Sequence, residues 1–323
     1  MKKIIPAFLS LLSLSLIEAR ETVEFVPSPP PEESEPWFTG PLLTPSAQVV
    51  PYGHVNFEPY IYWTQTRNKF NSHWHSFSIP HGNQLLSQNF IQSGIYNKLE
   101  LDLTPQFAYN KKQGQHMWRV LDMPFGLAYQ LYADENNRHV PKLKLRMQAT
   151  APIGKYDRLD PEKNGTDIGG TGSWNPQFGL VFSELFYIKG AHYLSTRVFV
   201  NYVIPTPVHV RGISAYGGTH KTRGTVYPGN QLVVAAAMEY SFTQNWVYAM
   251  DLLYVHSNKT RFSGKKGSPI APGGPSSENF SVAPAIEYNW SSDIGIIAGP
   301  WIVFAGRNTE QFISWVAAVN FYF

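Results

Sequence analysis

Two segments of the chain carry ionisable side chains at every second position. The residues are Lys98, Glu100 and Asp102 in the first segment and Lys142, Lys144 and Arg146 in the second. Successive side chains of a β-strand point to opposite faces, so each segment predicts a strand with one charged and one apolar face. A row of cations could select passing ions. Acids and bases facing one another in a narrow space could equally pair and fill it, and both interpretations stay open here.

His256 directly precedes Ser257, and these two residue types can serve as general base and nucleophile. The stretch YVHSNKTRFSG at 254–264 resembles the active-site strand of outer-membrane phospholipase A, whose pattern is His-x-Ser-Asn-Gly. Here the two residues are adjacent, so in a strand they point to opposite faces and out of hydrogen-bonding reach. We therefore expect no catalytic residue and no enzyme.

Three histidines gather in HWHSFSIPH at 73–81, without a carboxylate or thiolate among them. Imidazole alone is a weak indication of zinc or copper, so we expect no metal site and no cofactor. The formal net charge is only +3. No basic run with interleaved aromatic residues occurs, which argues against nucleic acid as a partner.

The charged segments belong to a longer series of strand-like segments. We predict twelve strands, at 54–67, 83–93, 98–109, 121–132, 141–152, 176–187, 192–204, 229–240, 246–256, 278–288, 294–305 and 312–323. Short turns alternate with longer connections rich in Gly, Pro, Ser and Asn, the latter at 68–82, 110–120, 153–175, 205–228 and 257–277, with a brief one at 306–311. Outer-membrane barrels sort their connections in this way. The sequence therefore predicts an all-β fold, a transmembrane antiparallel up-and-down β-barrel of about twelve strands.

Composition favours a membrane barrel over a soluble protein. Charged residues make up 15% of the 323 residues and aromatic residues another 15%. Soluble domains carry about 25% charged residues. Outside the N-terminus no apolar run reaches the roughly 18 residues of a membrane-spanning helix. Cysteine is absent, which excludes a disulfide framework.

The N-terminal region divides into two parts ahead of the barrel. Residues 1–19 have the basic start, apolar core and small final residue of a signal peptide. Residues 20–53 form a proline-rich lead that we expect in the periplasm, and its apolar part WFTGPLL at 37–43 is a candidate plug. The barrel itself is expected to span 54–323.

Charged residues on predicted strands must face the lumen, because Lys or Arg facing lipid at mid-depth costs roughly 2–4 kcal/mol. This reasoning adds further lumen-facing candidates to the six named above. They are Glu58, Asp122, Arg197, Glu239, Asp251 and Glu287.

The chain ends on SWVAAVNFYF, and Phe323, Phe321 and every second residue back to Ile313, which directly precedes this stretch, are apolar. This ending resembles the C-terminal signature by which the outer-membrane assembly machinery recognises barrel proteins. The resemblance makes Phe321 and Phe323 the candidate assembly signal.

The stretch from Leu145 to Ser183 resembles the core of the bacterial outer-membrane β-barrel family named for the meta-pathway of phenol degradation. Members have a strand ending in Pro-Thr-Gly, then a glycine-rich loop and a Gly-x-Gly-x-Trp step. The matching positions here are Pro152, Gly154, Gly170, Gly172 and Trp174, although Ile153 stands in place of Thr. The resemblance implies a barrel that admits hydrophobic compounds.

These observations lead to a functional hypothesis and an alternative. We expect a passive or gated pore for small solutes, apolar ones among them, in the outer membrane of a Gram-negative cell, with both termini periplasmic. The expected partners are outer-membrane lipid and lipopolysaccharide, which Arg261, Lys265 and Lys266 could contact, together with the barrel assembly machinery. The alternative is a structural or adhesin-like barrel that works through its external loops.

Overall fold

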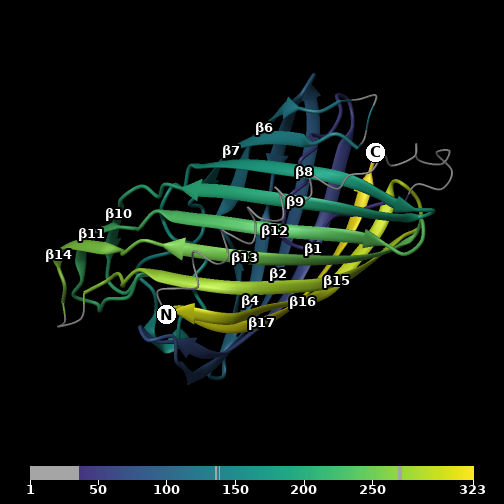
Figure 1. Ribbon diagram of the computed structural model, residues 1–323. Helices are drawn as coiled ribbons and strands as arrows, with labels where there is room; N and C mark the ends of the chain where they lie inside the picture. The colour runs from purple at the N-terminus through teal and green to yellow at the C-terminus, as the bar shows by residue number, and fades with distance from the viewer. Residues whose placement is uncertain (1–35, 135–136, 138, 268–270) are drawn as a thin grey trace. The chain divides into compact units, whose positions relative to one another are not determined.

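The computed structural model describes residues 36–323, apart from 135–136, 138 and 268–270 (Figure 1). The predicted signal peptide and the lead as far as residue 35 lie outside the described residues. Within the described residues, no helix is long and apolar enough to cross a membrane.

Twelve antiparallel wall strands close a barrel in the described part of the chain. They are β1 (Val55–Phe70), β2 (Ser76–Tyr96), β3 (Leu99–Leu103) continued by β4 (Gln106–Lys112), β5 (Gln115–Val120) continued by β6 (Met123–Tyr132), β7 (Lys142–Ala151), β8 (Gln177–Lys189), β9 (His192–Val203), β12 (Gln231–Ser241), β13 (Trp246–Ser257), β15 (Ser277–Asn289), β16 (Ile294–Arg307) and β17 (Glu310–Tyr322). β1 pairs with both β2 and β17, which closes the sheet. The predicted twelve-stranded fold is confirmed.

The outer face of the wall is apolar, as the alternation in the last strand predicts. Ile313 and Trp315 of β17 are 46% and 54% exposed, whereas Ser314 and Val316, which alternate with them, are buried. The same alternation exposes Ile61 and Trp63 on β1 and buries Tyr60 and Tyr62. A closed barrel with its apolar residues outside and its polar residues inside suits a lipid solvent rather than water.

A charge on this face provides a direct test of its solvent. Leu252 is exposed on β13, where it pairs with Ala236 and Val282 in the middle of the wall. We expect Leu252→Arg to destabilise the barrel in lipid vesicles by about 2–4 kcal/mol, measured by urea unfolding. Leu252→Met is the matched control and should change little. Equal stability of the two variants would contradict a lipid-facing position, because exposed sites facing water usually change by less than about 0.5 kcal/mol.

One wall strand contains a bulge that changes which residues face inward. Trp118 and Val120 of β5 are exposed on the outer face, but in β6 the odd-numbered Tyr129 and Leu131 are exposed, together with Tyr132 at the strand's end. The alternation of inward and outward side chains shifts at Leu121 and Asp122, between β5 and β6. There this strand has one residue more than the neighbouring strand has between β3 and β4. The bulge turns Asp122 inward.

The connections define two ends of the barrel. The turn end carries the connections β2–β3, β6–β7, β8–β9, β12–β13 and β15–β16. The start of β1 and the end of β17 also lie there, and the backbones of Val55 and Phe323 exchange two hydrogen bonds. The loop end carries the six other connections. Phe321 stacks on Phe57 near the turn end, so the last strand seals the wall.

Two of the predicted long loops are wrong. Segment 68–82 is largely strand, because β1 and β2 continue to Phe70 and from Ser76, and a wide bulge at 79–81 accommodates Pro80. Segment 110–120 is a tight hairpin whose turn residues Gln113 and Gly114 both have positive φ, 47° and 81°. Such a turn matches the twist of the flanking strands, so no long loop is needed.

A small second sheet stands at the loop end, built from the connections on either side of β12 and β13. Its strands are β10 (Val208–Arg211), β11 (Arg223–Tyr227) and β14 (Arg261–Lys265), in that order (Figure 1). Val208, Val210 and Val226 form its buried cluster, against which Tyr216 packs. Burial raises the pKa of Tyr216 to about 12, so its phenol stays neutral.

Candidate functional site

Residues 36–53, here called the inner segment, pack against inward-facing residues of the wall. Trp37 donates its backbone N–H to the carbonyl of Gln244 in the turn between β12 and β13. Leu42 and Ala47 are almost fully buried, and Leu42 belongs to a cluster that includes Tyr60 and Tyr62 of β1. The segment therefore passes the turn end and runs within the barrel before it joins β1.

Carboxylates of two neighbouring strands, β13 and β15, hold the first half of the inner segment. Glu287 accepts a hydrogen bond from the backbone N–H of Thr39 at 2.9 Å. Asp251 accepts the backbone N–H of Thr44 at 3.0 Å and its hydroxyl at 2.6 Å. The nearby Glu239 pairs with Arg197 at 2.8 Å. Charge-assisted bonds of this kind are the stronger ones in proteins, so this half is firmly placed.

Gly40 allows the inner segment to pass close to Arg197. Its φ is +112°, a backbone conformation that favours glycine, and a Cβ atom there would lie 3.2 Å from Nη1 of Arg197. The sequence Thr-Gly-Pro thus lets the chain turn against the guanidinium without a clash.

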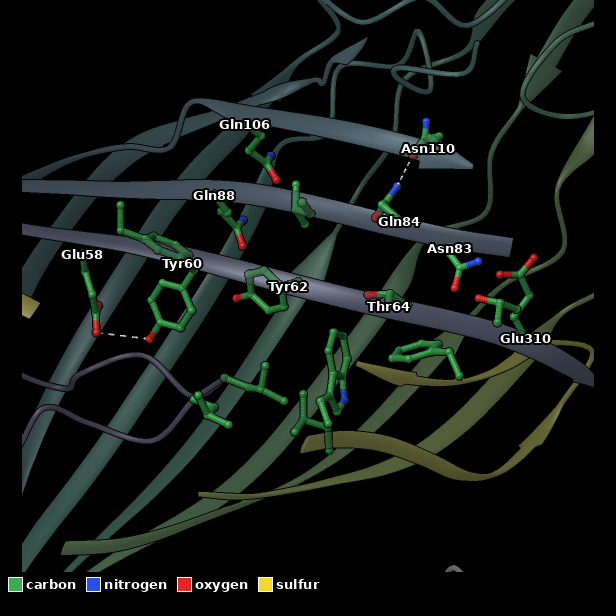
Figure 2. A pocket seen from close by; sticks show the side chains of 18 of the residues that line it. Glu58, Tyr60, Tyr62, Thr64, Asn83, Gln84, Gln88, Gln106, Asn110 and Glu310 are labelled. Carbon is green, nitrogen blue, oxygen red and sulfur yellow. Dashed lines mark hydrogen bonds between the residues drawn. The ribbon is translucent and has the colours of Figure 1, made fainter. Parts of the chain in front are cut away.

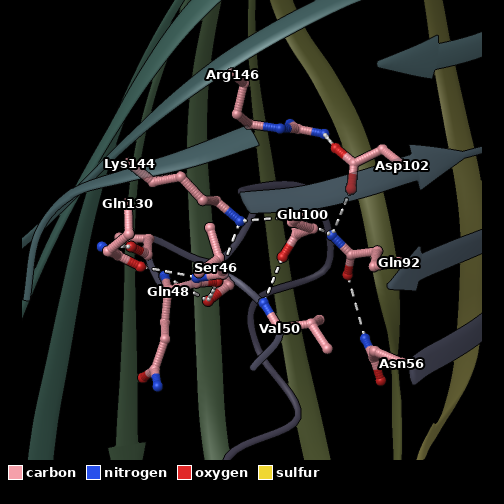
Figure 3. A network of polar contacts seen from close by, with 12 residues as sticks. Ser46, Gln48, Val50, Asn56, Gln92, Glu100, Asp102, Gln130, Lys144 and Arg146 are labelled. Carbon is pink, nitrogen blue, oxygen red and sulfur yellow. Dashed lines mark hydrogen bonds and ion pairs between the residues drawn. The ribbon is translucent and has the colours of Figure 1, made fainter. Parts of the chain in front are cut away.

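A second polar cluster holds the returning half of the segment (Figure 3). Glu100 accepts the backbone N–H of Val50 at 2.6 Å, and Lys144 donates to the carbonyl of Gln48 at 3.1 Å. Gln130 accepts the N–H of Val49 and donates to the carbonyl of Ala47. These contacts satisfy backbone groups that would otherwise be buried without partners.

Within this cluster the acids and bases of the two alternating segments meet. Lys144 pairs with Glu100 at 3.2 Å, with both side chains fully buried. Arg146 pairs with Asp102 at 3.3 Å, and the amide of Gln92 donates to both carboxylates. Lys144 and Arg146 of β7 are therefore paired with acids of β3 over the intervening strand β6, in the arrangement of a structural network rather than of a free cationic row.

The remaining predicted lumen charges have separate locations. Lys142 donates to the side chain of Gln48 at 2.7 Å. Glu58 accepts a hydrogen bond from the hydroxyl of Tyr60 at 3.2 Å. The prediction for Lys98 is wrong: it lies in the turn before β3 with a φ of 63° and an exposed side chain. The turn interrupts the alternation, so the charge faces solvent at the barrel end.

Asp122 holds the loop between β7 and β8, here called the inward loop (residues 152–176). Its carboxylate accepts the backbone N–H of Gly154 at 2.9 Å and that of Thr171 at 2.7 Å. Asn110 of β4 donates to the carbonyls of Thr166 and Ile168, both at 3.2 Å. The loop is thereby fixed to the inner faces of β4 and of the bulge.

The glycines of the family resemblance meet at this anchor. A Cβ atom on Gly170 would lie 2.0 Å from Oδ1 of Asp122, so only glycine lets the loop approach the carboxylate. Gly172, with a φ of 72°, lies against the ring of Tyr156. Pro152 begins the loop, and the half-exposed Trp174 near its end contacts Phe125 edge-on at 6.3 Å. Four of these five positions are thus tied to the shape of the loop, and Trp174 lies on the wall's outer surface.

A cavity of about 840 Å³ remains inside the barrel, between the inner segment, the inward loop and the wall. The inner segment contributes residues 39–46, and the inward loop contributes Asn164, Gly165, Thr166 and Ile168. Amide side chains follow β2 and β4, at Gln84, Gln88, Gln106 and Asn110 (Figure 2). Aromatic residues such as Tyr62, Phe90 and Trp301 complete an amphipathic lining.

This neutral amide lining was not predicted from the sequence, because only charged residues were taken as candidates for the lumen. The available signal was the spacing of Gln84, Gln88 and Gln92 at every fourth residue, which places them on one face of a strand. Segment 83–93 lacked charge alternation, so its polar face drew no attention.

The histidine and serine candidates form no catalytic arrangement. His256 contacts the side chain of Asn258, whereas the hydroxyl of Ser257 accepts a hydrogen bond from Gln231. His81 lies within β2, away from the turn that holds His73 and His75. Among the residues that the structure describes, no group of three or more His, Asp or Glu side chains could hold a metal ion.

Comparisons with known proteins give a similarity of fold. No family model matches the chain, and no curated protein matches its sequence. An outer-membrane channel from Pseudomonas putida F1 superimposes with a TM-score of 0.67 at 11% identity, over 86% of this chain and 98% of that one. The NanC porin gives a TM-score of 0.44 at 9% identity, over 81% and 98% of the two chains. The first of these shows that the chain has the fold of an outer-membrane barrel.

Proposed function

We propose that this chain is a channel of the bacterial outer membrane that admits small solutes, and that the inner segment is its plug. The observation that carries the proposal is the cavity of about 840 Å³, which the inner segment bounds on one side and the inward loop on another. A barrel that served only as a scaffold would need neither an internal space nor two chain segments folded against it.

The fold supports this proposal. The barrel from Pseudomonas putida F1 that superimposes with a TM-score of 0.67 is an outer-membrane channel. We propose that this chain also lies in the outer membrane of a Gram-negative cell, with the turn end and both termini in the periplasm. We propose Phe321 and Phe323 as the signal that the assembly machinery recognises. The glycine pattern of the inward loop supports a relationship to the meta-pathway family.

The lining suggests the class of solute. Amide and aromatic side chains line the cavity together with four cations. Arg146 and Arg197 are paired with carboxylates, whereas Lys111 and Lys112 form no ion pair with a described carboxylate. Within the described residues, Asn56 Oδ1 and Trp301 Nε1 are buried without a hydrogen-bond partner. We infer that the site suits small amphipathic molecules that combine an apolar part with a donor or an acceptor.

A plug can act as a gate if the wall remains intact when the plug leaves. The ion pairs Lys144–Glu100 and Arg197–Glu239 join wall strands to one another, so they persist without the inner segment. Asp251 and Glu287, by contrast, bind the segment through their carboxylates. Opening would expose these groups to water, which can replace the lost hydrogen bonds.

Uptake by liposomes tests the proposed function. Liposomes that contain the folded, signal-free protein should swell faster than empty ones in a small amphipathic solute such as benzyl alcohol, and less so in a disaccharide. Protein-containing and empty liposomes swelling alike, with folding verified by the heat-dependent shift on gels, would refute the channel.

Asp251 provides a test of the plug. We expect Asp251→Ala to raise the open probability in planar bilayers several-fold, because the inner segment loses three hydrogen bonds donated by Leu43 and Thr44. Asp251→Asn keeps an oxygen acceptor, so its open probability should lie between that of Asp251→Ala and that of the natural protein. Identical gating in all three proteins would show that this anchor does not hold the plug.

A further inference from the structure

The three-stranded sheet at the loop end has two chemically different faces. Val208, Val210 and Val226 are buried on one face, with Phe262 packed against them. Alternation along the strands therefore places the intervening residues on the opposite face, which is exposed to solvent. This outward face is not needed for the core of the sheet.

The outward face carries a row of cations across all three strands. Arg211 of β10 lies opposite Arg223 of β11, which in turn lies opposite Lys265 of β14. Adjacent strands are about 4.8 Å apart, so the row spans about 10 Å. Arg261 precedes Lys265 by four residues on β14, lies on the same face and is paired with Tyr227 of β11. All four cationic side chains are exposed.

One described carboxylate, that of Asp157, lies beside this row. None of the four forms an ion pair with a described carboxylate. Asp157 accepts the backbone N–H of Arg211 at 3.2 Å. Like charges directly opposite one another destabilise a sheet, so the row is unfavourable unless an external anion binds it.

Hydroxyl and imidazole groups adjoin the row. His209, Thr225 and Ser263 are the next set of paired residues, and the Thr225 hydroxyl contacts Nδ1 of His209 at 3.0 Å. Guanidinium groups bind phosphate oxygens in pairs, and hydroxyl groups donate further hydrogen bonds to them. The chemistry of the face thus fits a ligand that carries several phosphates.

The position of the sheet favours a lipid headgroup as that ligand. Only residues 228–230 separate β11 from β12, and only residues 258–260 separate β13 from β14. Three residues span at most about 11 Å, so the sheet stays close to the rim of the barrel (Figure 1). A soluble polyanion would impose no such closeness to the apolar wall.

We propose that the outward face of this sheet binds the phosphate groups of lipopolysaccharide in the surrounding leaflet. The proposal rests on the outer-membrane location proposed above, with the loop end outside. It extends the sequence-based expectation from Arg261 and Lys265 to a defined row that includes Arg211 and Arg223, residues distant in sequence.

Binding by the folded protein in detergent micelles tests this proposal. The variant Arg211→Gln/Arg223→Gln/Lys265→Gln should bind purified lipopolysaccharide about a hundredfold more weakly than the natural protein, the scale expected for three basic residues near an anionic surface. The control Lys98→Gln/Lys189→Gln removes two exposed cations at the turn end, away from that leaflet, and should bind normally. Dephosphorylated lipopolysaccharide should bind the natural protein as weakly as the first variant binds the intact lipid.

Several outcomes would overturn the proposal. They are equal binding by both variants, equal binding of the dephosphorylated lipid, and inorganic phosphate or polyglutamate binding as tightly as lipopolysaccharide. The last result would indicate an adventitious anion site or an acidic protein partner instead. The binding assay does not measure transport, so a negative result would not contradict the proposed channel function. Absence of transport would likewise not contradict the proposed lipopolysaccharide-binding face.

Discussion

A signal-free chain that begins at Ala47 should conduct several-fold more current per channel than one that begins at residue 20. The truncation removes residues 20–46, among them Thr39 and Thr44, whose backbone is bound by Glu287 and Asp251, and residues 39–46, which bound the cavity. It leaves Val49 and Val50 in contact with Gln130 and Glu100, so the second polar cluster remains assembled. Single-channel recording in planar bilayers measures the change.

A peptide with the sequence of residues 36–46 serves as the control for this truncation. Added on the side of the turn end, it should reduce the enlarged conductance, whereas a scrambled peptide should not. Unchanged conductance on truncation, in protein shown to be folded, would mean that the inner segment does not limit the passage. The inward loop held by Asp122 would then be the element to remove next.

The second large effect concerns the fully buried pair of Lys144 and Glu100. Glu100→Gln should destabilise the barrel by roughly 3–5 kcal/mol, because the lysine then keeps a buried charge without its partner. Lys144→Met should do the same through the remaining carboxylate. Urea unfolding in lipid vesicles gives the free energy of each variant.

The double variant Glu100→Gln/Lys144→Met separates the pair from its surroundings. Removing both charges should recover much of the lost stability, since the desolvation cost of the two ions is also removed. A double variant whose loss equals the sum of the single losses would indicate that the two residues act independently. That result would contradict the direct contact of 3.2 Å.

The sequence by itself determined the wall of the barrel. Segment 312–323 shows why: alternation in a strand assigns each side chain to lipid or lumen without reference to any other strand. Each of the twelve predicted strands overlaps an observed one, and the polar residues of 141–152 point inward at Lys144 and Arg146. The local pattern is enough to assign side chains to a face because, in a membrane barrel, one face of every strand meets lipid and the other meets the lumen.

Strand ends were harder to predict, because turn residues do not always end a strand. Pro80 and Gly82 suggested a loop, but a bulge takes up the proline while β2 continues. Lys98 followed the alternation of its segment, yet β3 begins only at Leu99, so Lys98 belongs to the preceding turn and does not face inward. Both outcomes depend on pairing with a neighbouring strand, which a single segment does not specify.

Only the tertiary structure decided what fills the barrel. Glu100 and Lys144 are 44 residues apart, and Thr44 and Asp251 are 207 apart. The choice of partner among many inward acids and bases depends on strand register and tilt around the closed wall. The sequence could mark residues 37–43 as a candidate plug, but which carboxylates bind their backbone, and how large a cavity remains beside them, follow from closure of the barrel.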